Sequence, residues 1–430
     1  MGFFLRVMIL ISWGMANSFL PISRSLIRRT RCFEMLSSPE VIDENAQNMS
    51  MTNACRVAAS FEARPFEPAW WGTNPHVMTI GGAGSLEKQL GEAQEPLCYR
   101  REFWNTPDGD RIAVDFSDAH EKTKESASVL VVMTHGLESR SNAPLTERMA
   151  RAFNRHGFDV CVVSFRSCAY DNDVPRKPGG YHLGFTQDLN FVTNKLFLES
   201  GMKKRIYLSG FSLGGNVVLK LLGELGVEAS TFNGIVGAAV TCVPFKPADC
   251  APLLSKGFNR LVYSGNFLKS LKPKASLQVD TLGRDAFPVD FDIAKVLAAE
   301  SIGDFDDAFI APIYGFKNKW QYYETQGSAS GKFLQLIKVP TLAVNALDDP
   351  FIESSTLPTA EEVGLSVPLR LVYHRHGGHC GFVSAHPPKE SFHAPDSSPS
   401  LLQTRDWLPV ELARFVGHCE MERQRGDGFS

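Results

Sequence analysis

The 430-residue sequence has no excess of either charge. Its 44 Lys and Arg residues nearly balance its 47 Asp and Glu residues, which leaves a formal net charge of −3. A protein that binds a phosphate backbone carries a basic surface, because counter-ion release drives that binding. We therefore expect no nucleic-acid partner. Hydrophobic residues make up 43% of the chain, as in ordinary globular proteins, which excludes disorder or a coiled coil for most of it.

The sequence also lacks the cysteine patterns of a metal cage or a disulfide framework. It has nine cysteines, an odd number, and they are widely scattered with no C-x-x-C pair. Zinc-binding and disulfide-rich proteins place their cysteines at short, regular spacings. We therefore expect reduced, buried thiols, no structural metal and no cofactor.

The N-terminal segment contains no apolar run that reaches the ~20 residues needed to span a bilayer. Its longest run is Val7–Ala16, and the whole segment 1–33 has five arginines and no acidic residue. Three interpretations stay open: a cleaved segment that targets a plastid or another organelle, a retained membrane anchor, and a tail without a role. Residues 34–60 are predicted to be a polar linker, and residues 421–430 a polar tail.

From residue 128 onward, short apolar segments alternate with amphipathic ones. This pattern is typical of an α/β fold, in which helices cover both faces of a mostly parallel sheet. The predicted strands are Ser128–Thr134, Phe158–Phe165, Arg205–Ser209, Gly234–Val243, Thr341–Ala346 and Leu369–Tyr373. The predicted helices include Pro144–His156, Thr186–Glu199 and Gly214–Gly226.

A segment of 95 residues, 244–338, separates the fourth and fifth predicted strands. Since a loop of this length is uncommon in a compact domain, we expect a helical insertion that forms a lid. Its aromatic residues either roof an apolar pocket for an acyl chain or pack the helices onto the sheet. They are Phe245, Phe258, Tyr263, Phe267, Phe309, Tyr314, Phe316 and Trp320.

The strongest local motif is Gly210–Gly214, which reads G-x-S-x-G between a predicted strand and a predicted helix. In this setting the motif is typical of a nucleophile elbow, a strained turn that projects the serine from the sheet edge. The flanking glycines remove Cβ atoms that would clash in the turn. The motif therefore predicts Ser212 as a nucleophile.

A serine nucleophile needs a general base, and the base needs a carboxylate that orients it. Asp348 and Asp349 follow the fifth predicted strand, and His379 lies in a glycine-rich loop after the sixth. The chain order Ser, acid, His is that of α/β-hydrolases. We predict Asp349 as the acid, because a turn that enters as Asp-Pro is the commoner acid loop; Asp348 stays an alternative that would otherwise brace the loop.

The predicted oxyanion hole combines two backbone N–H groups. One belongs to Leu213, directly after the nucleophile, and the other to Leu137, in the loop after the first predicted strand. His135 in that loop is expected to hold it by hydrogen bonding rather than to act as a base.

Two other motifs are not expected to bind a ligand. His374, His376 and His379 have a spacing that suggests a metal site, but no acidic partner follows, so we expect no metal site there. Gly81–Ser85 is predicted to be a loop rather than a phosphate cradle.

With these motifs, the chain resembles the AB hydrolase-4 family of α/β-hydrolases, which includes plant embryogenesis-associated hydrolases, bacterial YheT-type hydrolases and animal α/β-hydrolase-domain proteins. The resemblance covers about residues 62–420 and implies a hydrolase domain over 61–420 with its lid at about 244–338. It also implies Ser212 as nucleophile, Asp349 as acid and His379 as base. The motifs that carry it are Phe66–Trp71, Asn74–Thr79, Asp108–Asp110 with Val114 and Asp115, Thr134–Leu137, Phe165–Cys168, Tyr181–Leu189, Gly210–Asn216, Asn345–Phe351 and Gly377–His379.

The resemblance implies a serine esterase that acts on carboxylic or lipid esters of short or medium acyl chains, often with a membrane-associated N-terminus. Two departures affect the pocket: Ser167 stands where the family usually has glycine, and the Glu138–Ser141 loop lacks a common glycine. Two alternatives stay open. An acyltransferase or ester synthase would pass the acyl group to an alcohol instead of water, and a hydrolase-shaped binding protein would not turn over.

Overall fold

A computed structural model describes residues 52–85, 97–119, 123, 126–385 and 407–427 of the chain. The predicted targeting segment, 1–33, and most of the predicted linker, 34–51, lie outside the described residues. In the part that is described, no helix combines the length and the apolar character that crossing a bilayer requires.

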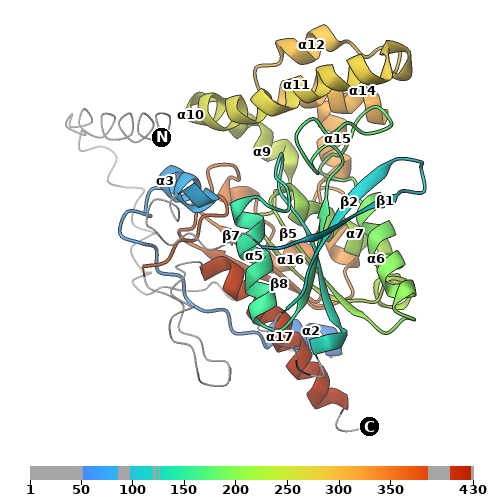
Figure 1. The fold of residues 1–430 in the computed structure, drawn as a ribbon. Coiled ribbons are helices and arrows are strands. Elements are labelled where there is room, and N and C mark those ends of the chain that lie inside the picture. Colours follow the sequence, from blue (N-terminus) through green and yellow to red (C-terminus); the bar gives the residue numbers. More distant parts are fainter. Residues whose placement is uncertain (1–51, 86–96, 120–122, 124–125, 386–406, 428–430) are drawn as a thin grey trace, which may run out of the picture. The chain divides into compact units, whose positions relative to one another are not determined.

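The fold is built on an eight-stranded sheet with the order β1-β2-β4-β3-β5-β6-β7-β8 (Figure 1). Six of these strands run parallel to one another. They are β3 (Val129–Thr134), β4 (Asp159–Ser164), β5 (Arg205–Phe211), β6 (Ile235–Thr241), β7 (Thr341–Ala346) and β8 (Leu369–His374). These are the six predicted strands, so the α/β fold with a mostly parallel sheet is confirmed.

The other two strands, β1 (Arg100–Asn105) and β2 (Arg111–Ser117), were not predicted. They form an antiparallel hairpin, and β2 extends the sheet by pairing antiparallel with β4. β1 is an edge strand whose residues are exposed or half-buried, so it has no apolar run that a sequence pattern detects. Its turn brings Asp108 and Asp110 to the sheet edge, where both take part in a network described below.

Alternating residues of the parallel strands face two separate halves of the core. In β3, Leu130 and Val132 pack with α6 (Gln187–Glu199) and α7 (Leu213–Leu225), whereas Val131 and Met133 pack with α5 (Pro144–Arg155). Successive side chains of β3 point to opposite faces of the sheet, and all of them are buried. Both faces of the sheet must therefore be covered by helices. The predicted helices match α5, α6 and α7 to within one residue at each end.

Two terminal elements correct the predicted domain boundaries. α2 (Asn53–Ala59) buries Cys55, Val57 and Ala58 against the folded domain, so the end of the predicted linker is structured. α17 (Trp407–Asp427) packs against α5 and β6 and continues through residues 421–427, which were expected to be a tail. The end of α17 was not recognised because residues 421–425 are exposed or half-buried and therefore show no apolar pattern.

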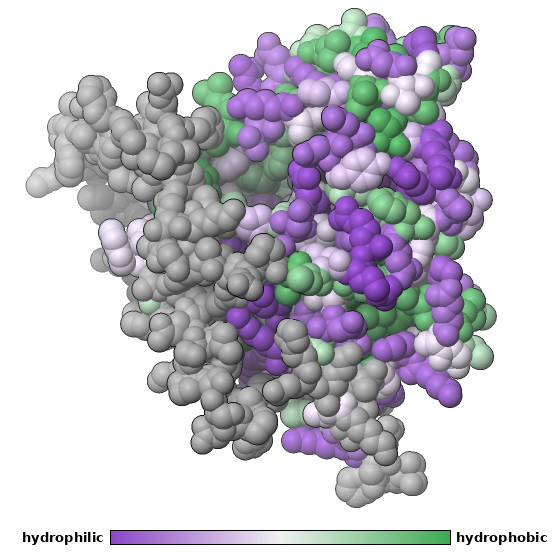
Figure 2. Space-filling view, in the orientation of Figure 1, coloured by the Kyte–Doolittle hydropathy of each residue, from purple (hydrophilic) through white to green (hydrophobic). Residues whose placement is uncertain are grey.

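The segment between β6 and β7 is a helical insertion with its own hydrophobic core, drawn in yellow and orange in Figure 1. Figure 2 shows hydrophobic side chains along a recess beneath it. Its helices are α9 (Pro247–Leu254), α10 (Gly257–Asn259), α11 (Gly265–Leu282), α12 (Ile293–Ala298), α13 (Ile302–Phe305), α14 (Ala311–Tyr314) and α15 (Lys319–Gln326). Its π-helical and 3-10 turns are η3 (Arg260–Ser264), η4 (Arg284–Ala286), η5 (Asp306–Ile310) and η6 (Leu334–Leu336).

Short elements complete the described fold. They are α3 (Pro75–Ile80), the π-helical turn η1 (Gly81–Ser85), η2 (Ser126–Ser128), α8 (Glu228–Asn233), η7 (Ser354–Thr356) and α16 (Ala360–Val363). The π-helical turn η1 replaces the loop predicted there. Gly82 in this turn passes so close to Gly381 that a Cβ atom at residue 82 would lie 2.3 Å from the Gly381 Cα.

Candidate active site

Ser212 occupies the turn between β5 and α7 in a backbone conformation that residues other than glycine rarely adopt. Its φ is 56° and its ψ is −126°. Its N–H donates to the carbonyl of Thr241 on β6 at 2.9 Å, which fixes the turn against the sheet. Such strain persists only where the surroundings impose it, and it is characteristic of functional turns. The serine thus sits at the carboxyl end of β5, at the start of a helix.

The two glycines that flank Ser212 allow backbone segments to approach closely. A Cβ atom on Gly214 would lie 2.4 Å from the carbonyl oxygen of His135, and one on Gly210 would lie 2.7 Å from backbone atoms of Gly214. Either methyl group would push the start of α7 away from the end of β3. The G-x-S-x-G pattern is therefore a packing requirement of this turn.

The structure brings together the three residues predicted as a triad, from loops far apart in the sequence. Nε2 of His379 lies 2.8 Å from Oγ of Ser212, and Nδ1 of His379 lies 2.8 Å from Oδ2 of Asp349. Oδ1 of Asp349 accepts the N–H of Phe351 at 2.8 Å, so both carboxylate oxygens have partners. With the Nδ1 proton directed to Asp349, Nε2 is free to accept the Ser212 hydroxyl proton.

The second candidate acid, Asp348, lies beside the triad and contacts a different histidine. Oδ2 of Asp348 is 3.1 Å from Nδ1 of His376, and Oδ1 accepts the N–H of Gly378 at 2.9 Å. Asp348 therefore ties its own loop to the loop that carries His379. This is the bracing arrangement that the sequence analysis gave as the alternative role for Asp348.

Helix α3 holds the His379 loop through a residue that the sequence analysis did not single out. The hydroxyl of Thr79 accepts the His379 N–H at 2.8 Å and donates to the Pro75 carbonyl at 2.7 Å. Gly378 has a φ of +56°, and a Cβ atom there would lie 2.7 Å from the Thr79 hydroxyl. Thr79 belongs to the Asn74–Thr79 motif, for which the sequence alone indicated no chemical role.

His379 is surrounded by groups that affect its basicity. Burial opposes the charged form of the ring, but the adjacent Asp349 carboxylate outweighs burial, and the pKa of His379 is raised above its usual value. The ring also stacks on Phe351, with centroids 4.1 Å apart. A histidine with a raised pKa is suited to accept a proton and hold it during a reaction.

The two predicted oxyanion donors line the same cavity as Ser212 and His379. Leu213 is the first residue of α7, and N–H groups in the first turn of a helix have no partner within the helix. Leu137 lies in the loop after β3. The loop is held as expected by His135, whose Nδ1 donates to the Gly136 carbonyl while Nε2 accepts the Phe165 N–H. Burial lowers the pKa of His135 to about 4, so this ring is neutral.

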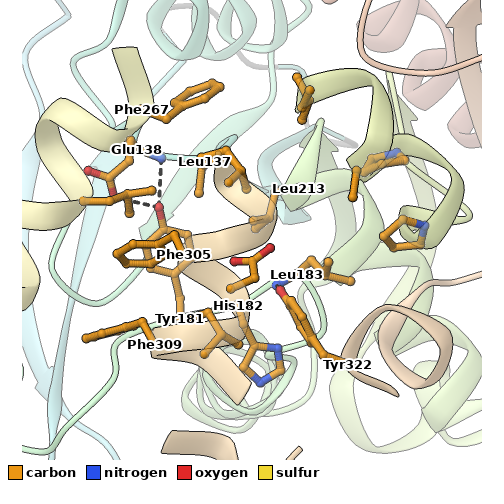
Figure 3. Close-up of a pocket in the computed structure, with 18 of the residues that line it drawn as sticks. Leu137, Glu138, Tyr181, His182, Leu183, Leu213, Phe267, Phe305, Phe309 and Tyr322 are labelled. Atoms are coloured by element: carbon orange, nitrogen blue, oxygen red, sulfur yellow. Dashed lines mark hydrogen bonds between the residues drawn. The ribbon is translucent and has the colours of Figure 1, made fainter. Parts of the chain in front are cut away.

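The cavity above Ser212 has a volume of about 1120 Å³, including its open mouth, and most of its walls are apolar. Figure 3 shows Phe267, Phe305, Phe309 and Tyr322 of the insertion arranged around Leu137 and Leu213. Of the eight aromatic residues predicted as a roof, Phe267 and Phe309 line the cavity. The other six do not, because they pack against neighbouring side chains or, like Trp320, are exposed. Tyr322, Tyr323 and Phe305 were missed, since a chain pattern does not reveal which helix face meets the cavity.

One ion pair connects the insertion to the loop that carries Leu137. Nζ of Lys274 on α11 lies 2.8 Å from Oε2 of Glu138, and the Tyr181 hydroxyl donates to Oε1 of Glu138 at 3.0 Å. The N–H of Glu138 in turn donates to the Tyr181 hydroxyl at 2.8 Å, as the dashed lines in Figure 3 show. Glu138 has a φ of +54°, and it begins the loop that lacks a glycine common in the family that the chain resembles. Its contacts account for the strained conformation of the loop.

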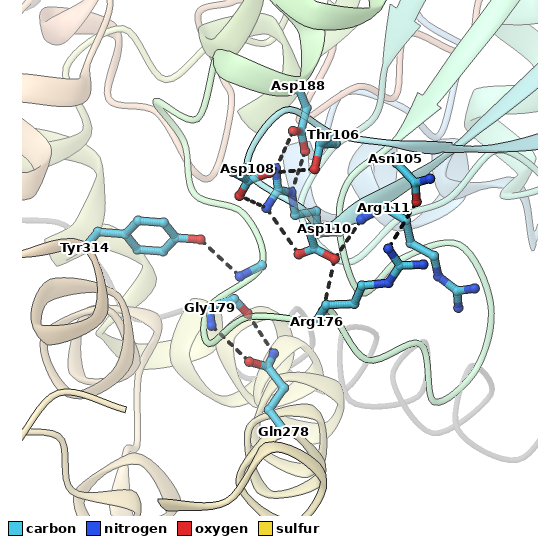
Figure 4. Close-up of polar contacts among 12 residues, drawn as sticks. Asn105, Thr106, Asp108, Asp110, Arg111, Arg176, Gly179, Asp188, Gln278 and Tyr314 are labelled. Carbon is cyan, nitrogen blue, oxygen red and sulfur yellow. Dashed lines mark hydrogen bonds and ion pairs between the residues drawn. The ribbon is translucent and has the colours of Figure 1, made fainter. Parts of the chain in front are cut away.

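A second polar network joins three motifs that had no assigned role. The guanidinium of Arg166 donates to both carboxylate oxygens of Asp188, at 2.8 and 2.6 Å, and to those of Asp108, at 2.8 and 3.1 Å. It also donates to Asp110 at 3.1 Å. The hydrogen bonds from Arg166 hold the pKa of Asp108 below its usual range. Figure 4 shows the carboxylates of Asp108, Asp110 and Asp188 close to one another.

This network is connected to the insertion through the loop that follows Arg166. The Gly180 N–H donates to the Tyr314 hydroxyl at 3.0 Å, and Gln278 accepts the Gly179 N–H and donates to the Gly179 carbonyl (Figure 4). The β1–β2 hairpin, the end of β4 and the insertion therefore share one set of polar contacts. These motifs therefore contribute to a structural network rather than to the triad.

The three histidines with metal-like spacing lie in different environments. His374 packs on Trp407, His376 pairs with Asp348, and His379 contacts Ser212. Among the described residues, one group of three has candidate ligand atoms within 4.8 Å of one another: the thiols of Cys242 and Cys380 together with His379. Both thiols are buried and both ring nitrogens of His379 are engaged, so a metal ion there would have to disrupt the contacts of the triad residues.

Comparison with known proteins bears on the fold and the family of the chain. The model of the alpha/beta hydrolase fold family matches residues 129–385. The putative esterase YheT of Escherichia coli (strain K12) is 30% identical over 298 residues, which cover 67% of this chain and 82% of that protein. An abhydrolase domain-containing protein of Dictyostelium discoideum is 28% identical, covering 74% and 76%. Phospholipase ABHD3 of Homo sapiens is 27% identical, covering 74% of this chain and 75% of that protein.

Proposed function

Since this chain belongs to the α/β-hydrolase fold family, in the branch of the YheT-type esterases, we propose that it is a serine esterase that hydrolyses carboxylic or lipid esters of short or medium acyl chains. The observation that carries the proposal is the contact of Ser212 with His379, and of His379 with Asp349, each at 2.8 Å, in the wall of an apolar cavity. The relatives are named as a putative esterase, a phospholipase and, for ABHD2 of Homo sapiens, a monoacylglycerol lipase.

In the first step, Nε2 of His379 takes the hydroxyl proton of Ser212 while Oγ attacks the ester carbonyl. Asp349 holds the ring in the tautomer that this transfer requires and stabilises the imidazolium that forms. The raised pKa of His379 supports the role of proton acceptor. The imidazolium then gives its proton to the departing alcohol, and an acyl-enzyme remains on Ser212.

The negative charge on the attacked carbonyl oxygen is stabilised by the N–H groups of Leu213 and Leu137. A backbone donor in such a position typically lowers the barrier by about 2.7–4 kcal/mol, because it is fixed before the charge develops. The N-terminal end of α7 adds a favourable dipole at the same place. Water that enters the cavity, activated by His379, then releases the acid.

Labelling with a fluorophosphonate probe tests the activated serine. We expect wild-type protein to be labelled and Ser212→Ala and His379→Ala to lose labelling, while the control Ser366→Ala, at an exposed serine, keeps it. Labelling of Ser212→Ala at the wild-type rate would contradict the proposal. A folded wild-type protein that is neither labelled nor active on any ester would favour the binding-protein alternative.

Product analysis then separates a hydrolase from an acyltransferase. With an ester substrate and an added alcohol, hydrolysis releases free acid, whereas acyl transfer yields a new ester. We expect free acid as the main product across a panel of p-nitrophenyl esters from acetate to dodecanoate. A new ester as the main product at modest alcohol concentration would instead assign acyl transfer to the same triad.

A further inference from the structure

The π-helical turn η5 brings one acidic residue to the wall of the cavity. Asp306, the first residue of η5, lines the same cavity as Ser212 and His379. Its side chain retains accessible surface although protein surrounds it, as expected for a residue that forms a cavity wall. π-helical turns inside helices are frequent at functional sites, because they displace a side chain from its regular position.

Two other polar side chains that line the cavity, Glu138 and Gln278, already have partners within the protein, whereas the Ser167 hydroxyl, which also lines it, has none among the described residues. Glu138 pairs with Lys274 and accepts the Tyr181 hydroxyl. Gln278 uses both ends of its amide on Gly179, at 3.0 and 2.7 Å. These contacts hold the insertion in place and occupy the polar atoms of Glu138 and Gln278. They are therefore structural rather than ligand-binding groups.

The carboxylate of Asp306 has an unused capacity to accept hydrogen bonds. Within the described residues its side chain has one hydrogen bond, in which the Tyr323 hydroxyl donates to Oδ2 at 2.6 Å. A carboxylate offers about four acceptor sites. The nearby ammonium of Lys319 is directed to Asp304 instead, at 3.8 Å. Burial raises the pKa of Asp306 to about 7, which reflects how poorly the cavity solvates its charge.

The walls near Asp306 are aromatic. Phe305 and Phe309 stack with centroids 5.0 Å apart, and both line the cavity together with Tyr323. A polar group that enters such a space loses its water and needs a partner, whereas a plain alkyl chain would offer no donor to the acceptor sites of Asp306 that Tyr323 leaves unused. Apolar pockets commonly use a few placed polar groups in this way to select a ligand.

We propose that Asp306 determines specificity by accepting a hydrogen bond from a hydroxyl or ammonium group on the part of the ester that enters the cavity. The substrate class is then an ester with a hydrogen-bond donor on its chain, rather than a plain hydrocarbon ester. This inference rests on the proposed esterase function and adds the feature of the substrate that the cavity recognises.

Matched esters test this preference on both sides of the ester bond. One series compares ethyl esters of C4 to C10 acids with their ω-hydroxy and ω-amino analogues. The other compares acetates of C4 to C10 alkanols with the monoacetates of the matching diols and the acetates of amino alcohols. Acid release is followed by pH-stat. We expect at least one chain length, in one of the two series, at which kcat/KM for the hydroxy or amino ester exceeds kcat/KM for the matching plain ester by at least about tenfold.

Variants of Asp306 test whether that residue is responsible. We expect Asp306→Leu to reverse the preference toward the plain ester. Asp306→Asn, which keeps the shape and an acceptor oxygen, should retain part of a hydroxyl preference but lose an ammonium preference. Asp290→Leu changes an exposed aspartate of the same insertion and should leave the ratio unchanged. A preference of the wild type for plain esters at every length, or an unchanged ratio in Asp306→Leu, would overturn the inference.

Labelling of Ser212 distinguishes this failure from failure of the proposed function. Asp306→Leu and Asp306→Asn should both still be labelled by the fluorophosphonate probe, because the printed side-chain hydrogen bond of Asp306 is with Tyr323 and not with a triad residue. If labelling and plain-ester hydrolysis persist without any donor preference, the esterase function stands and the role of Asp306 is refuted. If the wild type hydrolyses no ester in either series, both are refuted.

Discussion

Asparagine substitutions at Asp349 and at Asp348 separate the two carboxylates that the sequence offered as the triad acid. The Asp349 side chain is fully buried and lies 2.8 Å from Nδ1 of His379. An asparagine in its place can donate to Nδ1, which moves the ring proton to Nε2 and removes the acceptor for the Ser212 hydroxyl. A change to the wrong tautomer costs about 10⁴-fold in kcat, or about 5.4 kcal/mol of barrier.

The matched substitution at the neighbouring position should have a much smaller effect. In Asp348→Asn the amide oxygen can still accept the Gly378 N–H, and the contact with His376 is partly exposed. The loss of one such contact is worth about 1 kcal/mol, which corresponds to less than tenfold in rate. The assay is kcat for p-nitrophenyl butanoate hydrolysis, with circular dichroism as a check of folding. A larger loss in Asp348→Asn than in Asp349→Asn would refute the assignment.

The pH profile gives a second readout of the same pair. His379 must be neutral to accept a proton, so kcat/KM falls as the pH drops through the pKa of His379 in the free enzyme. Asp349 raises this pKa against the effect of burial. In Asp349→Asn the carboxylate is lost and burial remains, so the acid limb of the residual activity should move to lower pH. An unchanged or higher midpoint would contradict the proposed electrostatics.

Further predictions concern stability, the elbow, the insertion and metals. Arg166→Met leaves buried carboxylates unpaired and should lower the free energy of unfolding by about 3–5 kcal/mol in urea titrations; a loss below 1 kcal/mol would show that the network contributes little. Gly214→Ala places a Cβ atom 2.4 Å from the His135 carbonyl, so fluorophosphonate labelling should fall at least about 100-fold even where folding is retained. Lys274→Met removes the partner of Glu138 and should lower kcat about tenfold with little change in KM, whereas Lys272→Met on the same helix should not. EDTA should leave the hydrolysis rate unchanged, and loss of activity that added Zn²⁺ restores would refute a metal-free mechanism.

Three elements of the fold were beyond sequence patterns for identifiable reasons. The hairpin β1–β2 was missed because β1 lies at an edge and its side chains are exposed or half-buried, so it shows no apolar run. The end of α17 and the helix α2 were assigned to a tail and a linker because polar composition was taken as absence of structure. In each case the element is stabilised by contacts with residues far away in the chain, and a local pattern contains no information on those contacts.

The sequence by itself determined the six parallel strands, the elbow at Ser212 and the order of serine, acid and histidine. These are local properties: buried strands must be apolar, a tight strand-to-helix turn needs glycine, and loops at strand ends carry the reactive groups. The sequence favoured Asp349 and left Asp348 open, and the tertiary structure decided that Asp349 reaches His379, that Thr79 holds the His379 loop, and that Asp306 faces the cavity. Adjacent residues such as Asp348 and Asp349 have almost the same sequence context but point in different directions, so only the packing of distant segments determines which of them meets the base.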